Sequence, residues 1–449
     1  MNDNNILNDN IYKTFIKYVS LNIMSMLGLS LYILADTYFI SNGVGSDGLV
    51  ALNLVLPAYS LINGVGLLLG MGGATRFSIA LGKNHHEKCE QIFTQVIYWG
   101  LGIGFIITII GIFFSRNIVK LLGASYLILP LANSYLKTIM CLSLGFIINN
   151  IIVCFVRNDS DPNLAMLAML TASGSNIILD YIFIYPMKLG MFGAAFATAL
   201  APLFSMLVLS THFLRKKNTF KLSKRPLIKN EVKPIIFSGI PSFITELSSG
   251  VVILIFNMIV LNLEGNMGIG AYGIISNISL VCVSIFTGIG QGIQPIISIN
   301  FGANKINNIT KTFYCALILS IISGLFFYIF GLSFNSEIIS LFNKDGNLQL
   351  AKIASQGISL YFLAFILMGI NIVSTSLFTS ISMPKQGFII SLLRGFIIII
   401  PTVLTLSSIY KIKGVWLSMP ITEAITLILC IILLKLHFSK ISDENISKD

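Results

Sequence analysis

The chain of 449 residues is two copies of one unit, as comparison of the sequence with itself at a shift of 220 residues shows. Residues 70–121 align with residues 290–341 without a gap. Beyond that stretch the register drifts by a few residues, so that Gly145 lies opposite Gly369. Any fold proposed for the chain must therefore contain two similar halves.

Both halves are too apolar for a soluble domain. Hydrophobic residues make up 55% and charged residues 10% of the chain, whereas soluble domains carry about 25% charged residues. Twelve apolar segments, six per half, reach the length of about 20 residues that a membrane-spanning helix needs. Their length and their lack of alternation favour helices over strands. They cover residues 14–41, 48–81, 91–115, 127–156, 163–185, 190–214, 234–262, 268–301, 311–334, 350–380, 386–409 and 412–437.

The sequence thus predicts an all-α integral membrane protein with twelve transmembrane helices in two pseudo-symmetric six-helix lobes. Duplicated membrane halves are typical of secondary transporters. The predicted units are an N-lobe at residues 1–215, a basic linker at 216–232 and a C-lobe at 233–449.

Basic residues orient the predicted helices. Nineteen Lys and Arg residues fall on the side of the two termini and seven on the opposite side. Because Lys and Arg accumulate on the cytoplasmic side of membrane proteins, both termini are predicted to be cytoplasmic. The net charge of +11 then reflects membrane topology, and no nucleic-acid partner is expected.

Other functional classes lack their motifs. The sequence has no Walker A motif, no His/Glu metal motif and no Ser/Lys dyad, so neither ATP-driven transport nor enzymatic activity is expected. The six cysteines are scattered without metal-binding or disulfide spacing.

Four acidic residues lie deep within the apolar segments: Asp36, Asp180, Glu246 and Glu423. A carboxylate at the centre of a membrane helix costs roughly 2.5–3.5 kcal/mol on insertion scales. Such residues therefore normally face a cavity, pair with a cation or carry protons.

Helix rise places several oxygen-bearing side chains at one depth in the N-lobe. At about 1.5 Å per residue, Asp36 lies about 28 Å and Asp180 about 25 Å from the inner side, and Thr198 about 10 Å from the outer side. Asn176 precedes Asp180 by four residues and shares its helix face. Tyr32 stands in the same relation to Asp36.

This set of side chains suits a small cation. Carboxylate, amide and hydroxyl oxygens are ligands for hard cations, and two neighbouring carboxylates resist double ionisation. Asp36, Asn176, Asp180 and Thr198 are therefore predicted to bind H⁺ or Na⁺. The structural alternative is that Asp180 and Asn176 only satisfy one another between helices.

The acids of the second half leave two alternatives open. Glu246 lies about 20 Å from the inner side and Glu423 about 12 Å from the outer side, so their depths nearly coincide in a core about 30 Å thick. Arg394, in the eleventh segment, could neutralise either one. These residues and Tyr32 are predicted as additional coupling or substrate residues, or else as a buried structural Glu–Arg pair.

Several motifs resemble those of the MATE (multidrug and toxic compound extrusion) family, and the resemblance covers about residues 12–438. The second-half motif looks most like the bacterial branch with DinF-like and MepA-like exporters. The motifs are ADTYFISNGVG at 35–45, GGATRFSIALG at 72–82, NIILD at 176–180, GAAFAT at 193–198 and QGIQPIISINFGA at 291–303.

The resemblance implies a MATE/MOP-type fold, with two six-helix lobes around a central cleft, and export of amphiphilic, often cationic drugs coupled to a cation. The family's N-lobe cation site has a helix-1 Asp, a helix-5 Asn and Asp, and a helix-6 Thr, which correspond here to Asp36, Asn176, Asp180 and Thr198. Glu246 resembles the helix-7 acid that some members use. Other members use a helix-10 acid, and this chain has only Asn371, Ser374 and Thr375 near that position.

The predicted function is a multidrug efflux antiporter driven by H⁺ or Na⁺ through alternating access. It is expected in the bacterial cytoplasmic membrane as a monomer, with small-molecule drugs and the lipid bilayer as partners and no cofactor besides the coupling ion. The alternative is a lipid-linked oligosaccharide flippase of the same superfamily. Its anionic cargo would favour several arginines in the cavity, whereas only Arg76 and Arg394 are intramembrane here.

Overall fold

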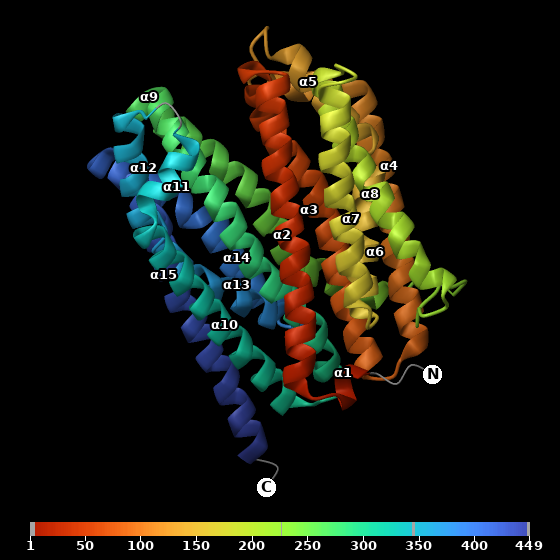
Figure 1. The fold of residues 1–449 in the computed structure, drawn as a ribbon. Helices are drawn as coiled ribbons and strands as arrows, with labels where there is room; N and C mark the ends of the chain where they lie inside the picture. Colours follow the sequence, from red (N-terminus) through yellow and green to blue (C-terminus); the bar gives the residue numbers. More distant parts are fainter. Residues whose placement is uncertain (1–4, 226, 344–345, 447–449) are drawn as a thin grey trace.

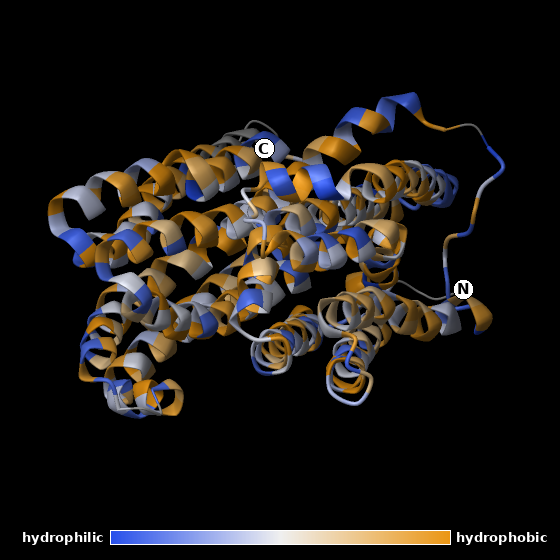
Figure 2. Cartoon of the chain, turned by 90° about the horizontal axis from the view of Figure 1, so that it is seen from above, coloured by the Kyte–Doolittle hydropathy of each residue, from blue (hydrophilic) through white to orange (hydrophobic). Residues whose placement is uncertain are grey.

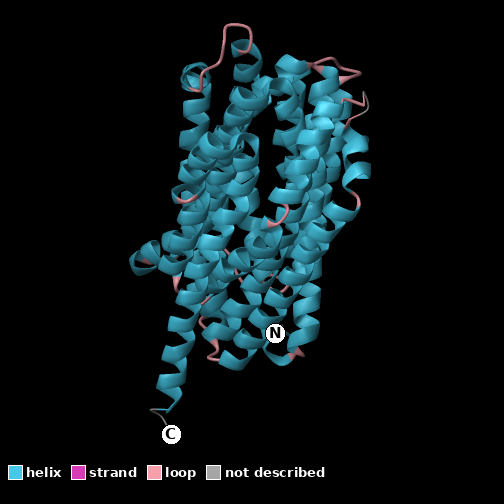
Figure 3. Ribbon diagram, turned by 90° about the vertical axis from the view of Figure 1, so that its left-hand side faces the viewer, coloured by secondary structure: helices cyan, strands magenta, loops and turns pink. Residues whose placement is uncertain are grey.

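The computed structural model describes residues 5–225, 227–343 and 346–446, and within these ranges the chain forms helices and short loops without strands (Figure 3). The two terminal stretches, residues 1–4 and 447–449, and Pro226 in the predicted linker lie outside the described residues. The helices of the first half are α1 (Asn5–Asn8), α2 (Ile11–Gly43), α3 (Ser46–Gly82), α4 (His86–Leu121), α5 (Leu129–Cys141), α6 (Ser143–Asn158), α7 (Pro162–Ile184) and α8 (Gly190–Leu214).

The second half starts with the longest helix, and a π-helical turn, η1, lies between its last two helices. Its elements are α9 (Lys229–Gly302), α10 (Ile306–Ser333), α11 (Asn335–Phe342), α12 (Leu348–Tyr361), α13 (Ala364–Ser380), α14 (Pro384–Leu392), η1 (Leu393–Ile397) and α15 (Ile399–Ile446).

Helix α9 is two membrane spans joined at a reversal. Its 74 residues would extend about 110 Å if straight, far more than a bilayer core of about 30 Å. Gly265, with φ 61°, interrupts the helical backbone at its middle. Gly239, near one end, packs on Gly72 of α3, and Gly302, at the other end, packs on Gly82 of the same helix. Both ends of α9 therefore lie against the same region of α3, so the chain turns back at Gly265.

The last span pair reverses in the same way. Residues Pro384–Leu436 form a continuous stretch of 53 apolar helical residues, again too long for one crossing. Lys411, with φ 54°, breaks the helical backbone. A Cβ on Gly414 would lie 1.9 Å from the Leu406 carbonyl oxygen, so the two helices meet in a tight turn that only glycine permits.

Two further spans are broken at matching positions in the two halves. The axes of α5 and α6 differ by 51° across Leu142, and those of α12 and α13 differ by 46° across residues 362–363. The sequence predicted one helix in each place, 127–156 and 350–380. The break repeats about 220 residues later, which extends the internal symmetry from sequence to backbone shape.

Counted this way, the described residues form twelve spans. Helices α2, α3, α4, α7, α8 and α10 each cross once, α9 and α14–α15 each cross twice, and the bent pairs α5–α6 and α12–α13 each cross once. The prediction of twelve helices in two six-helix lobes is confirmed. Large exposed apolar side chains such as Phe113 and Leu207 cover the outside, and apolar residues predominate along the helices (Figure 2), as lipid contact requires.

The two bundles diverge toward the end marked by α5 and α12 and converge toward α1 (Figure 1). The convergence depends on close backbone contact between α3 and α9. A Cβ on Gly239 would lie 1.9 Å from the Leu68 carbonyl oxygen, and one on Gly72 would lie 2.2 Å from the Ile235 carbonyl oxygen. We call this the inner end of the molecule, because the basic linker and the N-terminal helix α1 lie there.

We expect Gly239→Ala to open the inner end, because its methyl group would collide with main-chain atoms that cannot move aside cheaply. Spin labels at His86 and Asn307, two exposed positions at the inner end of opposite lobes, would report a longer or broader distance in a background without native cysteines. Gly102→Ala is the matched control, because a Cβ there meets no atom within 4 Å. Equal distance distributions for both variants would contradict the role of this contact.

Candidate functional site

The four predicted cation-site residues come together in the N-lobe, between three helices. Asp36 is on α2, Asn176 and Asp180 are on α7, and Thr198 is on α8. All four are buried: Asp36 is 7% exposed, Thr198 is 4% exposed, and the other two are fully enclosed. We call this group the N-lobe acid cluster.

Asn176 bridges the cluster through its amide. With the amide nitrogen facing α7, it donates to Asp180 Oδ2 at 3.0 Å, and the amide oxygen accepts from Thr198 Oγ1 at 3.2 Å and from the Thr198 backbone N–H at 3.3 Å. This orientation satisfies both ends of the amide, whereas the reverse orientation turns its oxygen toward acceptors.

The carboxyl groups of Asp36 and Asp180 are close enough to influence each other's charge. Two carboxylates in contact repel when both are ionised, so the pair is stable only with a bound proton or a bound cation. One oxygen of each, Asp36 Oδ1 and Asp180 Oδ1, has no hydrogen-bond partner. Such buried, unused acceptor atoms are where a small cation would bind.

Tyrosines surround the cluster, and the sequence indicated only one of them. Tyr135, on α5, lies near Thr198 and is 4% exposed. Tyr32, one turn before Asp36 on α2, pairs with Tyr59 of α3, the two hydroxyl oxygens being 3.2 Å apart. Tyr135 and Tyr59 could not be placed by depth along a single helix, because their contacts depend on how α3 and α5 are rotated.

Glu246 does not join the C-lobe acids but reaches into the N-lobe. Its carboxylate accepts a hydrogen bond from Asn63 Nδ2 at 2.8 Å, and Asn63 Oδ1 accepts from Asn150 Nδ2 at 2.7 Å. Glu246 is on α9, Asn63 on α3 and Asn150 on α6. The contact therefore crosses between the lobes, which depth alone did not indicate.

Arg394 pairs with Glu423, which answers the question that the sequence left open. Arg394 Nε donates to Glu423 Oε1 at 2.5 Å, and Asn371 Nδ2 donates to Glu423 Oε2 at 2.7 Å and to the Glu423 carbonyl oxygen at 3.0 Å. Glu423 is fully buried. Helix α13 has no acidic residue near Asn371, and Glu423 of α15 supplies a carboxylate there instead. We call these three residues the C-lobe ion pair.

The surroundings of the C-lobe ion pair are polar and incompletely hydrogen-bonded. Arg394 lies in η1, and π-helical turns are frequent at functional sites. Buried oxygen atoms of Asn371, Ser374 and Thr422 have no hydrogen-bond partner. The arrangement gives Glu423 a counter-charge, so the two residues together carry no net charge into the membrane.

A second cross-lobe contact closes the inner end. Glu231, in the first turn of α9, binds Arg76 of α3 at 2.8 Å and Lys88 of α4 at 2.5 Å. Arg76 Nη1 also donates to Ser382 Oγ, between α13 and α14, at 3.1 Å. Glu231 is 4% exposed. These four residues form the Glu231 cluster, which ties the N-lobe helices α3 and α4 to the C-lobe.

We expect Glu231→Gln to loosen the inner end, because the substitution leaves Arg76 and Lys88 without their buried counter-charge. Hydrogen exchange should become faster in residues 72–82 and 229–239. Glu87→Gln is the matched control, because Glu87 pairs with Arg225 on an exposed surface, where ion pairs contribute little. Unchanged exchange in Glu231→Gln would show that the cluster does not hold the lobes together.

The acid clusters do not resemble a transition-metal centre. The described part of the chain contains no group of three or more His, Cys, Asp or Glu side chains that could hold a metal ion. The N-lobe acid cluster instead offers two carboxylates with neutral oxygen ligands, a set whose chemistry suits H⁺ or Na⁺.

A duplicated twelve-span fold with buried ionisable clusters defines a membrane transporter. The MatE family model matches residues 22–182 and 241–404, one segment in each half of the sequence. This chain belongs to the MatE family.

Relatives and solved structures agree with the family assignment. The chain is 29% identical to the multidrug export protein MepA of Staphylococcus saprophyticus over 400 residues, which cover 88% of this chain and 87% of the relative, and 29% identical to MepA of Staphylococcus aureus over 401 residues with the same coverage. Its fold matches an outward-facing multidrug resistance MATE family transporter of the MOP superfamily with a TM-score of 0.91, 20% identity and 99% of both chains covered. A MOP superfamily transporter from Pyrococcus furiosus gives a TM-score of 0.89 at 21% identity, with 97% of both chains covered.

Proposed function

We propose that the chain exports amphiphilic, often cationic small molecules in exchange for H⁺ or Na⁺ bound at the N-lobe acid cluster. The observation that carries the proposal is the burial of two neighbouring carboxyl groups, Asp36 and Asp180, in one group with Asn176 and Thr198. A buried acid pair that needs a proton or cation to be stable is a natural coupling site. The similarity to multidrug export proteins supports drugs as the cargo.

The orientation of the Asn176 amide indicates which ion the site suits. In the orientation that satisfies its hydrogen bonds, the amide nitrogen faces Asp180, an arrangement that suits an acid pair sharing a proton. Binding of Na⁺ would require the amide to rotate so that its oxygen joins the ligands. The arrangement therefore favours H⁺ in this conformation.

Helix α2 provides the connection between the cluster and the lobe interface. Asp36 lies in its outer half, and its inner half packs closely on α9, where a Cβ on Gly292 would lie 2.8 Å from Val19 Cα and one on Gly288 would lie 2.7 Å from Ile23 Cα. A shift of α2 on ion binding would thus be transmitted directly to the C-lobe. In the proposed cycle, ion entry from outside weakens drug binding, and ion loss to the inside follows opening of the Glu231 cluster.

The proposed setting is the cytoplasmic membrane of a bacterium, with both termini in the cytoplasm and a single chain as the working unit. The excess of basic residues at the inner end supports this orientation. Three basic residues of the linker, Lys221, Lys224 and Arg225, are exposed at the same end.

The test is ethidium efflux from proteoliposomes that are loaded with the dye and given either a pH gradient or a Na⁺ gradient. We expect one of the two gradients to drive efflux. Protein-free liposomes and collapse of the gradient by an ionophore are the controls. Because one charge moving down 100 mV supplies about 2.3 kcal/mol, a coupled protein should sustain a dye gradient of tens of fold.

Efflux that is independent of both gradients would contradict coupling. Absence of ethidium transport, together with movement of a lipid-linked oligosaccharide donor across the same liposomes, would favour the flippase alternative.

A further inference from the structure

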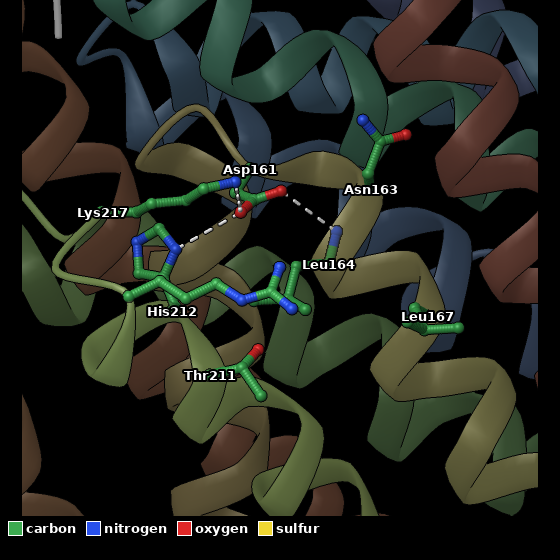
Figure 4. Close-up of a pocket in the computed structure, with 8 residues that line it drawn as sticks. Asp161, Asn163, Leu164, Leu167, Thr211, His212 and Lys217 are labelled. Atoms are coloured by element: carbon green, nitrogen blue, oxygen red, sulfur yellow. Dashed lines mark hydrogen bonds and ion pairs between the residues drawn. The ribbon is translucent and has the colours of Figure 1, made fainter.

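A small cavity lies at the inner end of the N-lobe, between the first turns of α7 and the last turn of α8 (Figure 4). Its volume is about 260 Å³. It is separate from the acid clusters. Its lining combines one acidic side chain with basic, neutral polar and apolar ones: Asp161, Asn163, Leu164, Leu167, Thr211, His212, Arg215 and Lys217.

The two acids beside the cavity, Asp159 and Asp161, are already paired with other groups of the protein. His212, 1% exposed, has its Nε2 atom 2.9 Å from Asp159 Oδ2 and its Nδ1 atom 3.5 Å from Asp161 Oδ2. Asp159 also accepts the Thr219 backbone N–H at 2.8 Å, and Asp161 accepts the Leu164 N–H at 3.2 Å.

Asp161 is held in its ionised form by these contacts. Burial alone would raise the pKa of its carboxyl group, but the neighbouring His212 ring, the hydrogen bond from the Leu164 N–H and the charge of Lys217 lower the pKa below its ordinary value. The carboxylate therefore serves as a fixed part of the wall.

The rim of the cavity carries more positive charge than the wall neutralises. Lys217 Nζ lies 3.8 Å from Asp161 Oδ2, a loose contact at an exposed lysine. Arg215 makes no ion pair with any described residue. Arginine and lysine side chains in this setting bind phosphate oxygens, arginine often through two parallel hydrogen bonds.

One side of the cavity is lined by apolar side chains that are at least partly exposed. Leu167 on α7 is 51% exposed, and Leu164 is half-buried one turn nearer the inner end. A ligand with a phosphate and an attached hydrocarbon would contact both kinds of surface. A free anion would use only the basic rim.

We propose that this cavity binds the phosphate headgroup of an anionic lipid from the inner leaflet. Arg215 and Lys217 contact the phosphate, Thr211 and Asn163 hydrogen-bond the headgroup, and Leu164 and Leu167 pack against the start of the acyl chains. Basic pockets between transmembrane helices are suited to this role. The proposal depends on the membrane fold and not on the transported substrate.

The test compares lipid binding to the purified full-length protein by native mass spectrometry, with dioleoyl-phosphatidylglycerol and dioleoyl-phosphatidylcholine as probes. We expect the protein to retain the anionic lipid in preference to phosphatidylcholine. Arg215→Gln/Lys217→Gln should lower that preference by roughly thirtyfold, as the loss of two basic residues next to an anionic headgroup predicts. Arg215→Lys/Lys217→Arg should keep most of it.

The matched control is Lys221→Gln/Lys224→Gln, which removes the same charge from exposed linker positions. An equal loss of preference in this control would overturn the proposal, because the attraction would then belong to the linker as a whole. Displacement of the lipid by inorganic phosphate at millimolar concentration would also overturn it, by assigning the cavity to a free anion. All four side chains are exposed, and equal thermal unfolding midpoints would show that the variants fold alike.

Discussion

Asp36→Asn and Asp180→Asn should each reduce gradient-driven ethidium efflux to the level of protein-free liposomes. A carboxamide cannot take up and release a proton, and it removes one of the two negative charges that would attract Na⁺. We expect a loss of at least roughly tenfold, because the driving force of one ion, about 2.3 kcal/mol per 100 mV, is no longer coupled to the dye. The measurement is the initial rate of efflux under the gradient that drives the unmodified protein.

Asp47→Asn is the matched control for this experiment. It makes the same chemical change at an exposed residue in the first turn of α3, and it should leave efflux unchanged. Thr198→Ala should have an intermediate effect, because the loss of one neutral hydrogen bond costs about 1 kcal/mol, or about fivefold in affinity for the ion. Normal coupling in Asp36→Asn and Asp180→Asn would exclude the N-lobe acid cluster and make Glu246 the next residue to test.

Glu423→Gln should strongly destabilise the protein. The substitution leaves the Arg394 guanidinium in the membrane interior without its carboxylate, and breaking a buried ion pair in this way costs about 3–5 kcal/mol. Thermal unfolding in detergent, followed by the fluorescence of the buried Trp416 in the same lobe, should show a clearly lower midpoint. Arg394→Met/Glu423→Leu should recover much of the loss, because it removes both charges together.

Glu337→Gln serves as the control. It makes the same chemical change at an exposed acid of the C-lobe, and it should not change the unfolding midpoint. The result also separates the two alternatives for the C-lobe ion pair. A stable Glu423→Gln protein that no longer transports would show that Glu423 takes part in transport. A destabilised protein whose double variant still transports would make the pair structural.

The sequence predicted the parts of the fold that depend on chain length and polarity. Twelve spans follow from apolar runs that match bilayer thickness, and the reversals at Gly265 and Lys411 separate segments that the sequence already divided. The breaks within α5–α6 and α12–α13 were not predicted, because both sides of each break are equally apolar and hydropathy contains no information on a change of axis.

The candidate site was accessible to sequence reasoning only in part. Depth along three helices indicated that Asp36, Asp180 and Thr198 share one level, and the structure has their side chains in one group. Depth could not assign partners to Glu246 or Glu423. The two acids lie at similar depths in the membrane, but Glu246 contacts the N-lobe and Glu423 contacts the C-lobe. Partner choice depends on the rotation of each helix about its axis, and this rotation is set by packing between segments that are far apart in the sequence.

The even number of spans in each half has a consequence for the origin of the molecule. Six crossings return a chain to the side from which it started, so both copies enter the membrane the same way up, and the linker between them need not cross it. A single ancestral half could therefore have paired with a second identical subunit, inner end beside inner end, before the two genes fused. The two halves now differ in how they neutralise buried acids: one has two acids close together, whereas the other balances its acid with an arginine.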